Sequence, residues 1–202
     1  MSLLDLLKNE AVRRGLLSPN AVLDPAAVFY LVRDMPYRRA SDRQPETIIR
    51  EWRGTCSGKH YLLAALFREL GLDARVMAGV LRYHPDPART DPRLLALLAP
   101  VGGVFVDVHN WVEIELPDGP MTVDATWPAK LKQYGFPVNE TFELGKSQAL
   151  AYPIFQTYIV PDDGDPQAFK EKLLQEHFTP AELAAREAFI RALSQMLTSA
   201  ET

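Results

Sequence analysis

The sequence has little of several features that mark particular classes of protein. It contains one cysteine in 202 residues, so no intramolecular disulfide can form and the composition suits a reducing compartment. No apolar run approaches the roughly 20 residues that a membrane span requires. Basic residues number 22 against 26 acidic ones, so no basic surface for nucleic acid is indicated. The first residues lack the pattern of a secretory signal, and we expect a cytoplasmic protein that binds neither nucleic acid nor membrane.

The residues that are present indicate one globular domain. The chain is 47% hydrophobic and 24% charged, which is ordinary for such a domain. Caps and prolines predict helix starts at Ser2, Asp24–Pro25, Pro45, Asp165–Pro166 and Thr179–Pro180. A further helix over 57–70 carries apolar residues almost all round, so we expect it to be central and buried.

Alternation of apolar and polar residues predicts strands after that helix. Valine-rich residues 74–81 indicate one strand, and the even positions of 104–116 are apolar, a period of two that is typical of a long strand. The PDGP block from Pro117 predicts a turn into another strand over 121–125, and residues 155–160 indicate a further one. We therefore expect a sheet built around a β-hairpin.

Cys56 is the first candidate for chemistry. It lies in RGTCSGKH, directly before the central helix, which places its sulfur at the helix N-terminus. Unpaired N–H groups and the positive end of the helix dipole stabilise a thiolate, which lowers the pKa of the thiol. The same N–H groups are suited to stabilise an oxyanion. The simpler alternative is that Cys56 is a small buried hydrophobic residue.

A thiolate nucleophile needs an imidazole that takes and returns a proton near neutral pH. The chain has four histidines. His60 is one helical turn after Cys56, while His84 and His177 lie in a loop and near a helix end. His109 lies on the strand 104–116, on the face opposite the valines, so we expect another element, such as the cysteine helix, to cover it. His109 is therefore the candidate base.

Asp124 is the candidate for the acceptor that orients this imidazole. It lies on the strand after the hairpin, where aspartate is disfavoured unless something retains it. In an antiparallel hairpin, the residue numbers of any two opposed residues have the same sum. A two-residue loop at 117–118 makes this sum odd. His109 and Asp124 then share one face of the sheet, diagonal to each other.

The segments GTCSGKHYLLAALFRELGLDARVMAGV and HNWVEIELPDGPMTVDATWP resemble the core of the transglutaminase-like superfamily. By this resemblance Cys56 is the nucleophile, His109 the general base and acid, and Asp124 the orienting residue. It implies an α+β, papain-like arrangement in which the central cysteine helix packs on an antiparallel sheet, with extra N- and C-terminal helices. We expect a single domain over residues 1–202, with a core at about 45–130 and a helical extension at about 165–200.

The chain also departs from the large cross-linking transglutaminases. Ser57 follows the cysteine where those enzymes commonly have tryptophan, and no acidic cluster has calcium-loop spacing. Small prokaryotic-type members, often peptidases or amidases, are the better comparison. We therefore predict a cysteine enzyme without cofactor or metal. It would act on a peptide, protein or small amide through a thioester, with hydrolysis favoured over cross-linking.

Two alternatives concern the whole site. The domain could be catalytically silent and serve as a binding or scaffold module, because fold does not guarantee function. Alternatively, Cys56, His60 and His109 could ligate zinc, since a cysteine and a histidine four residues apart share a helical face. The fourth ligand of such a site is not evident, and His60 is more simply a packed or surface side chain.

Other side chains near the motif also have two interpretations. Trp52, Trp111 and Trp127 could line a cleft for an acyl group, with the Trp52 indole N–H as an oxyanion donor, but large aromatics more often belong to the core. Lys59 and Arg53 could bind a substrate carboxylate. We expect them instead to lie on a solvated face.

Overall fold

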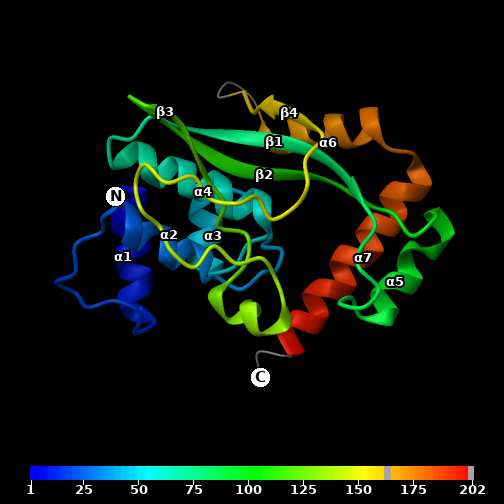
Figure 1. Ribbon diagram of the computed structural model, residues 1–202. Helices are drawn as coiled ribbons and strands as arrows, with labels where there is room; N and C mark the ends of the chain where they lie inside the picture. Colours follow the sequence, from blue (N-terminus) through cyan, green and yellow to red (C-terminus); the bar gives the residue numbers. More distant parts are fainter. Residues whose placement is uncertain (162–164, 200–202) are drawn as a thin grey trace. The chain divides into compact units, whose positions relative to one another are not determined.

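The computed structural model describes residues 1–161 and 165–199 (Figure 1). The helices are α1 (Leu3–Arg13), α2 (Pro25–Arg33), α3 (Pro45–Glu51), α4 (Cys56–Glu69), α5 (Pro92–Leu98), α6 (Pro166–His177) and α7 (Pro180–Ser199). The strands are β1 (Ala74–Tyr83), β2 (Phe105–Leu116), β3 (Gly119–Val123) and β4 (Gln156–Ile159), and two 3-10 turns are η1 (Ala99–Val101) and η2 (Ala129–Tyr134). The order of helices and strands confirms the predicted α+β class.

Helices α1, α2, α3, α6 and α7 begin where the sequence predicts, and the caps of several show why. At α1 the Ser2 hydroxyl accepts from the Asp5 N–H at 3.0 Å, and the Asp5 carboxylate accepts from the Ser2 N–H. Asp24 caps α2 by accepting from the Ala27 N–H at 2.7 Å. Thr179 and Glu182 form the predicted capping box at α7. Each cap satisfies N–H groups that have no partner within the helix.

The strands form one sheet in the order β3-β2-β1-β4. β2 and β3 pair antiparallel from Val112 with Val123 to Leu116 with Gly119. This register confirms the two-residue hairpin loop, because each pair of numbers has the same odd sum. β1 pairs antiparallel with β4 from Met77 with Ile159 onwards.

The chain divides into two compact units that share strands β1 and β2. The first comprises residues 1–76 and 110–151, and the second comprises residues 77–109 and the described residues from 152 on. The assignment of residues 1–202 to one domain stays a prediction.

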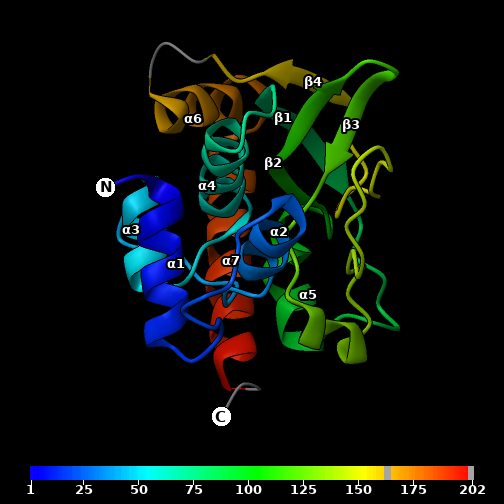
Figure 2. The same ribbon diagram turned by 90° about the vertical axis from the view of Figure 1, so that its left-hand side faces the viewer.

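In the first unit α4 is the central helix. It packs against α1, α2 and α3, and Figure 2 shows α1 and α3 side by side. Eleven of its 14 residues are buried, which confirms the prediction from its apolar surface. At its N-terminal turn the Ser57 hydroxyl donates to Asn110 Oδ1 at 2.8 Å, so α4 packs on the β2 part of the sheet.

In the second unit the C-terminal helices hold the first part of β2. The Asp107 carboxylate on β2 is within 2.6 Å of the Arg186 guanidinium of α7 and 3.6 Å of Lys170 Nζ of α6. Phe105 packs on Phe189 with ring centroids 4.7 Å apart. α5 lies against α7 (Figure 1). Across the described ranges 1–161 and 165–199, no helix combines the length and apolarity needed to cross a bilayer.

Candidate active site

Cys56 is the first residue of α4 and is 2% exposed. Thr55 before it is extended, with φ −87° and ψ −176°, and its side chain makes no cap hydrogen bond. The hydroxyl of Thr55 therefore does not occupy the N–H groups of the first turn. The sulfur stands at the N-terminus of a long buried helix, as the sequence predicts, where the helix dipole favours negative charge.

The turn that leads to Cys56 begins at Trp52, which ends α3 in the left-handed conformation with φ 52° and ψ 46°. A residue other than glycine adopts this conformation at a cost of roughly 1 kcal/mol, so surrounding contacts must hold it. The Arg14 guanidinium lies 5.1 Å from the centroid of the Trp52 ring. Trp52 is 7% exposed, and Trp111 and Trp127 are also buried, which confirms that the three tryptophans belong to the core. An oxyanion role for the Trp52 indole stays a prediction.

His60 is fully buried and both of its ring nitrogens have partners. Nδ1 is 2.7 Å from the Cys56 carbonyl oxygen, which can only accept, so Nδ1 carries the proton. Nε2 accepts from the Ala125 N–H at 2.8 Å. Nε2 also lies 3.5 Å from Asp124 Oδ1, a contact that is an ion pair only when the imidazole is protonated. His60 is thus a packed side chain with no nitrogen left for zinc or for a thiol proton.

Asp124 follows β3 directly, and its carboxylate is buried and fixed by hydrogen bonds. Oδ1 accepts from the Thr126 N–H at 3.0 Å and from the Thr126 hydroxyl. Oδ2 accepts from the Ala151 N–H at 2.8 Å. These donors keep the carboxylate in one orientation, as the predicted role of Asp124 requires.

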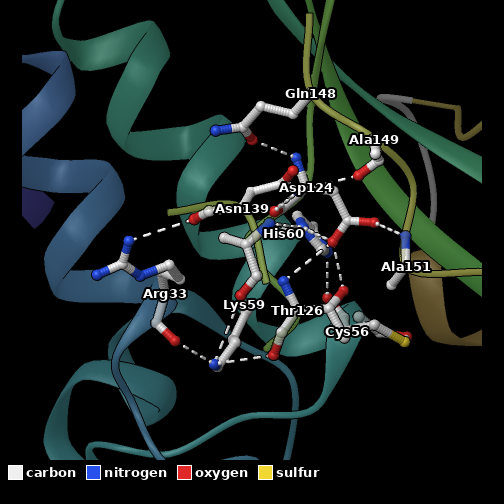
Figure 3. Close-up of polar contacts among 12 residues, drawn as sticks. Arg33, Cys56, Lys59, His60, Asp124, Thr126, Asn139, Gln148, Ala149 and Ala151 are labelled. Atoms are coloured by element: carbon white, nitrogen blue, oxygen red, sulfur yellow. Dashed lines mark hydrogen bonds and ion pairs between the residues drawn. The ribbon is translucent and has the colours of Figure 1, made fainter. Parts of the chain in front are cut away.

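The main chain of Asp124 is held as well as its carboxylate (Figure 3). Its N–H donates to Gln148 Oε1 at 2.9 Å, and its carbonyl accepts from Asn139 Nδ2 at 2.9 Å. The same Asn139 amide donates to the Ala149 carbonyl at 2.9 Å. Sequence reasoning missed Asn139 and Gln148. They lie in a segment of irregular structure, and no spacing or periodicity marks them as partners of Asp124.

The prediction that Lys59 lies on a solvated face is wrong. Lys59 is fully buried, and its Nζ donates to the carbonyls of Arg33 at 2.7 Å, Thr126 at 3.2 Å and Ala125 at 3.5 Å. Carbonyls from other parts of the chain replace water around the ammonium, which a sequence pattern does not reveal. Arg53 is partly exposed and pairs with Glu51, in agreement with the solvated interpretation.

His109 belongs to the second unit, where it lies on β2 and is fully buried. The Tyr152 ring packs on its imidazole with centroids 5.3 Å apart and planes at 69°. His84 is exposed in its loop, and His177 at the end of α6 is 3.0 Å from the Tyr158 hydroxyl. Cys56 and Asp124 therefore lie together in one unit and His109 in the other. The assembly of all three stays a prediction.

A cysteine at the start of a buried central helix, followed by an antiparallel sheet, defines an α+β protein with a papain-like fold. The family model of the transglutaminase-like superfamily matches residues 19–125, more than half of the chain, so the chain belongs to this superfamily. Its members generally have cysteine-dependent acyltransferase or protease-like activity. The searches of curated proteins and of solved structures found no match.

Proposed function

We propose that the protein is a cysteine-dependent acyl-transfer enzyme with Cys56, His109 and Asp124 as its triad. The substrate is a peptide, a protein or a small amide. The observation that carries the proposal is that the first unit contains both a cysteine at a helix N-terminus and a buried aspartate held by three donors. The superfamily match spans both residues and includes His109 between them.

The proposed reaction has two halves. The Cys56 thiolate attacks the carbonyl carbon of the amide, and the C–N bond breaks as His109 gives its proton to the departing amine. The products are an S-acyl thioester on Cys56 and a free amine. His109, now neutral, then removes a proton from water, whose oxygen attacks the thioester and releases the acid and the thiolate.

We propose hydrolysis rather than cross-linking as the second half. Water is the more abundant acceptor, whereas an amine acceptor must be bound in its place while water is kept out. Incubation of casein with a fluorescent primary amine separates the two outcomes. Peptide cleavage or ammonia release without amine incorporation supports hydrolysis, and incorporation of the amine into casein contradicts it. We also propose a cytoplasmic location, because the reacting thiol has to stay reduced.

Thiol labelling tests the triad without a known substrate. Iodoacetamide reacts with thiolate, so the pH at which labelling is half-maximal reports ionisation, while the plateau rate reports access to the buried sulfur. We expect wild-type Cys56 to label at pH 7 at least about tenfold faster than His109→Ala, with the half-maximal pH of the variant shifted upward. His84→Gln, an exposed histidine, is the matched control and should label like wild type.

The competing interpretation is a catalytically silent binding or scaffold domain, which superfamily membership also permits. In that case wild-type Cys56 would show the pH profile of an ordinary thiol. The profile would be the same in His109→Ala. That pair of results would remove the enzymatic proposal and leave the fold.

A further inference from the structure

Two titratable side chains next to Cys56 take no part in the proposed chemistry. Lys59 and His60 follow the nucleophile by three and four residues on α4, so they lie on the helical face that carries it. Both are fully buried. Burial of a lysine and a histidine is costly unless their polar atoms are used, so their partners indicate what they do.

The partners of both residues converge on Ala125, the residue after Asp124. His60 Nε2 accepts from the Ala125 N–H at 2.8 Å, and Lys59 Nζ donates to the Ala125 carbonyl at 3.5 Å. The backbone N–H and the backbone carbonyl of this one residue are therefore bound by consecutive residues of the cysteine helix. The other His60 nitrogen donates to the Cys56 carbonyl at 2.7 Å, so the imidazole links the two segments.

Lys59 extends the link to a third segment. Its ammonium has three protons, and they meet the carbonyls of Ala125, Thr126 and Arg33, the last residue of α2. The C-terminal end of a helix favours a cation. Burial raises the pKa of the nearby Asp34 carboxyl, but Arg33, the Ala129 N–H and the Lys59 charge together hold it below its ordinary value. Asp34 thus supplies a negative charge close to Lys59.

We propose that Lys59 and His60 are positioning residues that hold Asp124 in register with Cys56. The inference rests on the proposed function, because it assigns them to the alignment of the triad. In this role they act through Asp124 and not on the substrate. Loss of either contact lets residues 124–126 move relative to the start of α4, and Asp124 then no longer orients the imidazole that pairs with the thiolate.

The experiment compares His60→Gln, His60→Leu and Lys59→Met with wild type. Glutamine has an oxygen that accepts and an N–H₂ that donates, so it can replace both His60 contacts, whereas leucine can replace neither. Lys59→Met keeps the length of the side chain and removes the ammonium. His84→Gln and Lys172→Met, both at exposed positions, are the matched controls.

Two readouts separate positioning from a purely structural role. Amide hydrogen exchange of Ala125, followed by NMR, should accelerate at least about tenfold in His60→Leu and stay near wild type in His60→Gln. The half-maximal pH of Cys56 labelling should rise by about one unit in His60→Leu and Lys59→Met, and return in His60→Gln. The double variant His60→Leu with Asp124→Asn should show no larger shift than Asp124→Asn alone, because both act through one carboxylate.

Each outcome of these experiments either supports or contradicts the inference. If His109→Ala slows labelling but His60→Leu and Lys59→Met do not change its pH profile, the proposed function stands and this inference is wrong. If the shifts of His60→Leu and Asp124→Asn add, His60 acts independently of Asp124 and the inference is also wrong. If labelling is indifferent to His109→Ala, the proposed function fails and the inference with it. Should the variants not fold, NMR of wild type still tests the contact, since the Nε2–H tautomer of His60 would contradict it.

Discussion

At the scale of single residues, the side-chain amide of Asn139 shows how hydrogen bonds hold a segment without regular secondary structure next to Asp124. Its Nδ2 has two protons, and they bind the Asp124 carbonyl and the Ala149 carbonyl, each at 2.9 Å. One amide thus ties the end of the hairpin to the carbonyl of Ala149, which lies 10 residues after Asn139 in the chain. Neither carbonyl belongs to a ladder of β3, so a side chain supplies the donor that a strand would otherwise provide.

Substitution of Asn139 tests this tie. Asn139→Ala removes two hydrogen bonds worth about 1 kcal/mol each, so we expect the free energy of unfolding to fall by about 2 kcal/mol. Asn139→Asp should cost more, because it places carboxylate oxygens against two carbonyl oxygens. Urea denaturation measures both, with Asn20→Ala in an exposed loop as the control. Equal stability of Asn139→Ala and the control would show that the two contacts contribute nothing.

Sequence predicted the residues whose chemistry is unusual for their place, and missed those whose role depends on distant partners. Asp124 at the end of a strand contradicts ordinary propensity, and Cys56 is the one cysteine of the sequence and directly precedes a predicted helix, so both are noticeable without a structure. In the sequence Lys59 looks like any solvent-facing lysine, because the carbonyls that accept hydrogen bonds from its ammonium come from two remote segments. Asn139 and Gln148 look like ordinary loop residues for the same reason.

At the scale of elements, two glycines let the cysteine helix approach its surroundings. A Cβ on Gly58 would be 2.6 Å from Ile48 Cδ1 of α3, and a Cβ on Gly54 would be 3.2 Å from Lys59 Cγ. Ile48 is 1% exposed and has little room to move. α3 and α4 therefore pack at a distance that only glycine permits at residue 58, and the same packing encloses the stem of Lys59.

A double substitution tests the approach of α3 to α4. Glycine to alanine within a helix ordinarily stabilises by up to about 1 kcal/mol. We expect Gly58→Ala instead to destabilise by about 1 kcal/mol, because the new methyl group overlaps Ile48. On an Ile48→Val background, which lacks the Cδ1 atom and leaves only the Cγ1 contact at 3.3 Å, Gly58→Ala should be clearly less destabilising than in wild type. Thermal unfolding of the four proteins measures the coupling, and additive effects would contradict the steric explanation.

Elements with local signals were predictable, and those without were not. Proline or a polar cap marks the start of α2, α6 and α7, and alternation marks β2 and β3 together with their register. The 3-10 turns η1 and η2 carry no periodic pattern and were missed. A turn of three to six residues is too short for a periodic pattern of apolar residues to be detected.

At the scale of the whole molecule, the C-terminal helices are bonded to the core strand. The predicted helical extension supplies Arg186 and Lys170, and both face the buried Asp107 carboxylate of β2. Burial acts to raise the pKa of Asp107. The Arg186 and Lys170 charges, with hydrogen bonds from Arg186 and the Val108 N–H, outweigh it and hold the pKa below its ordinary value. Asp107 precedes His109 by two residues, so the same helices anchor the strand that carries the candidate base.

Arg186→Met tests whether this anchor stabilises the fold. We expect it to lower the free energy of unfolding at pH 7 by about 3 kcal/mol, because the buried carboxylate loses its closest cation and keeps the Val108 N–H at 2.7 Å and Lys170 at 3.6 Å. Arg191→Met, on the same helix, removes only an exposed pair with Glu187 and should cost less than about 0.5 kcal/mol.

The effect of Arg186→Met should depend on pH with a defined sign. The folded-state pKa of Asp107 lies below its unfolded value, so its stabilisation is complete above the unfolded pKa and is lost as the pH falls through the folded one. The gap in unfolding free energy between wild type and Arg186→Met should thus be constant from about pH 5 to 8 and narrow below about pH 4. Urea denaturation across this range measures the gap. A gap that persists undiminished in acid would mean that Arg186 stabilises through packing of its stem, and the ion pair would then not be what joins the helices to β2.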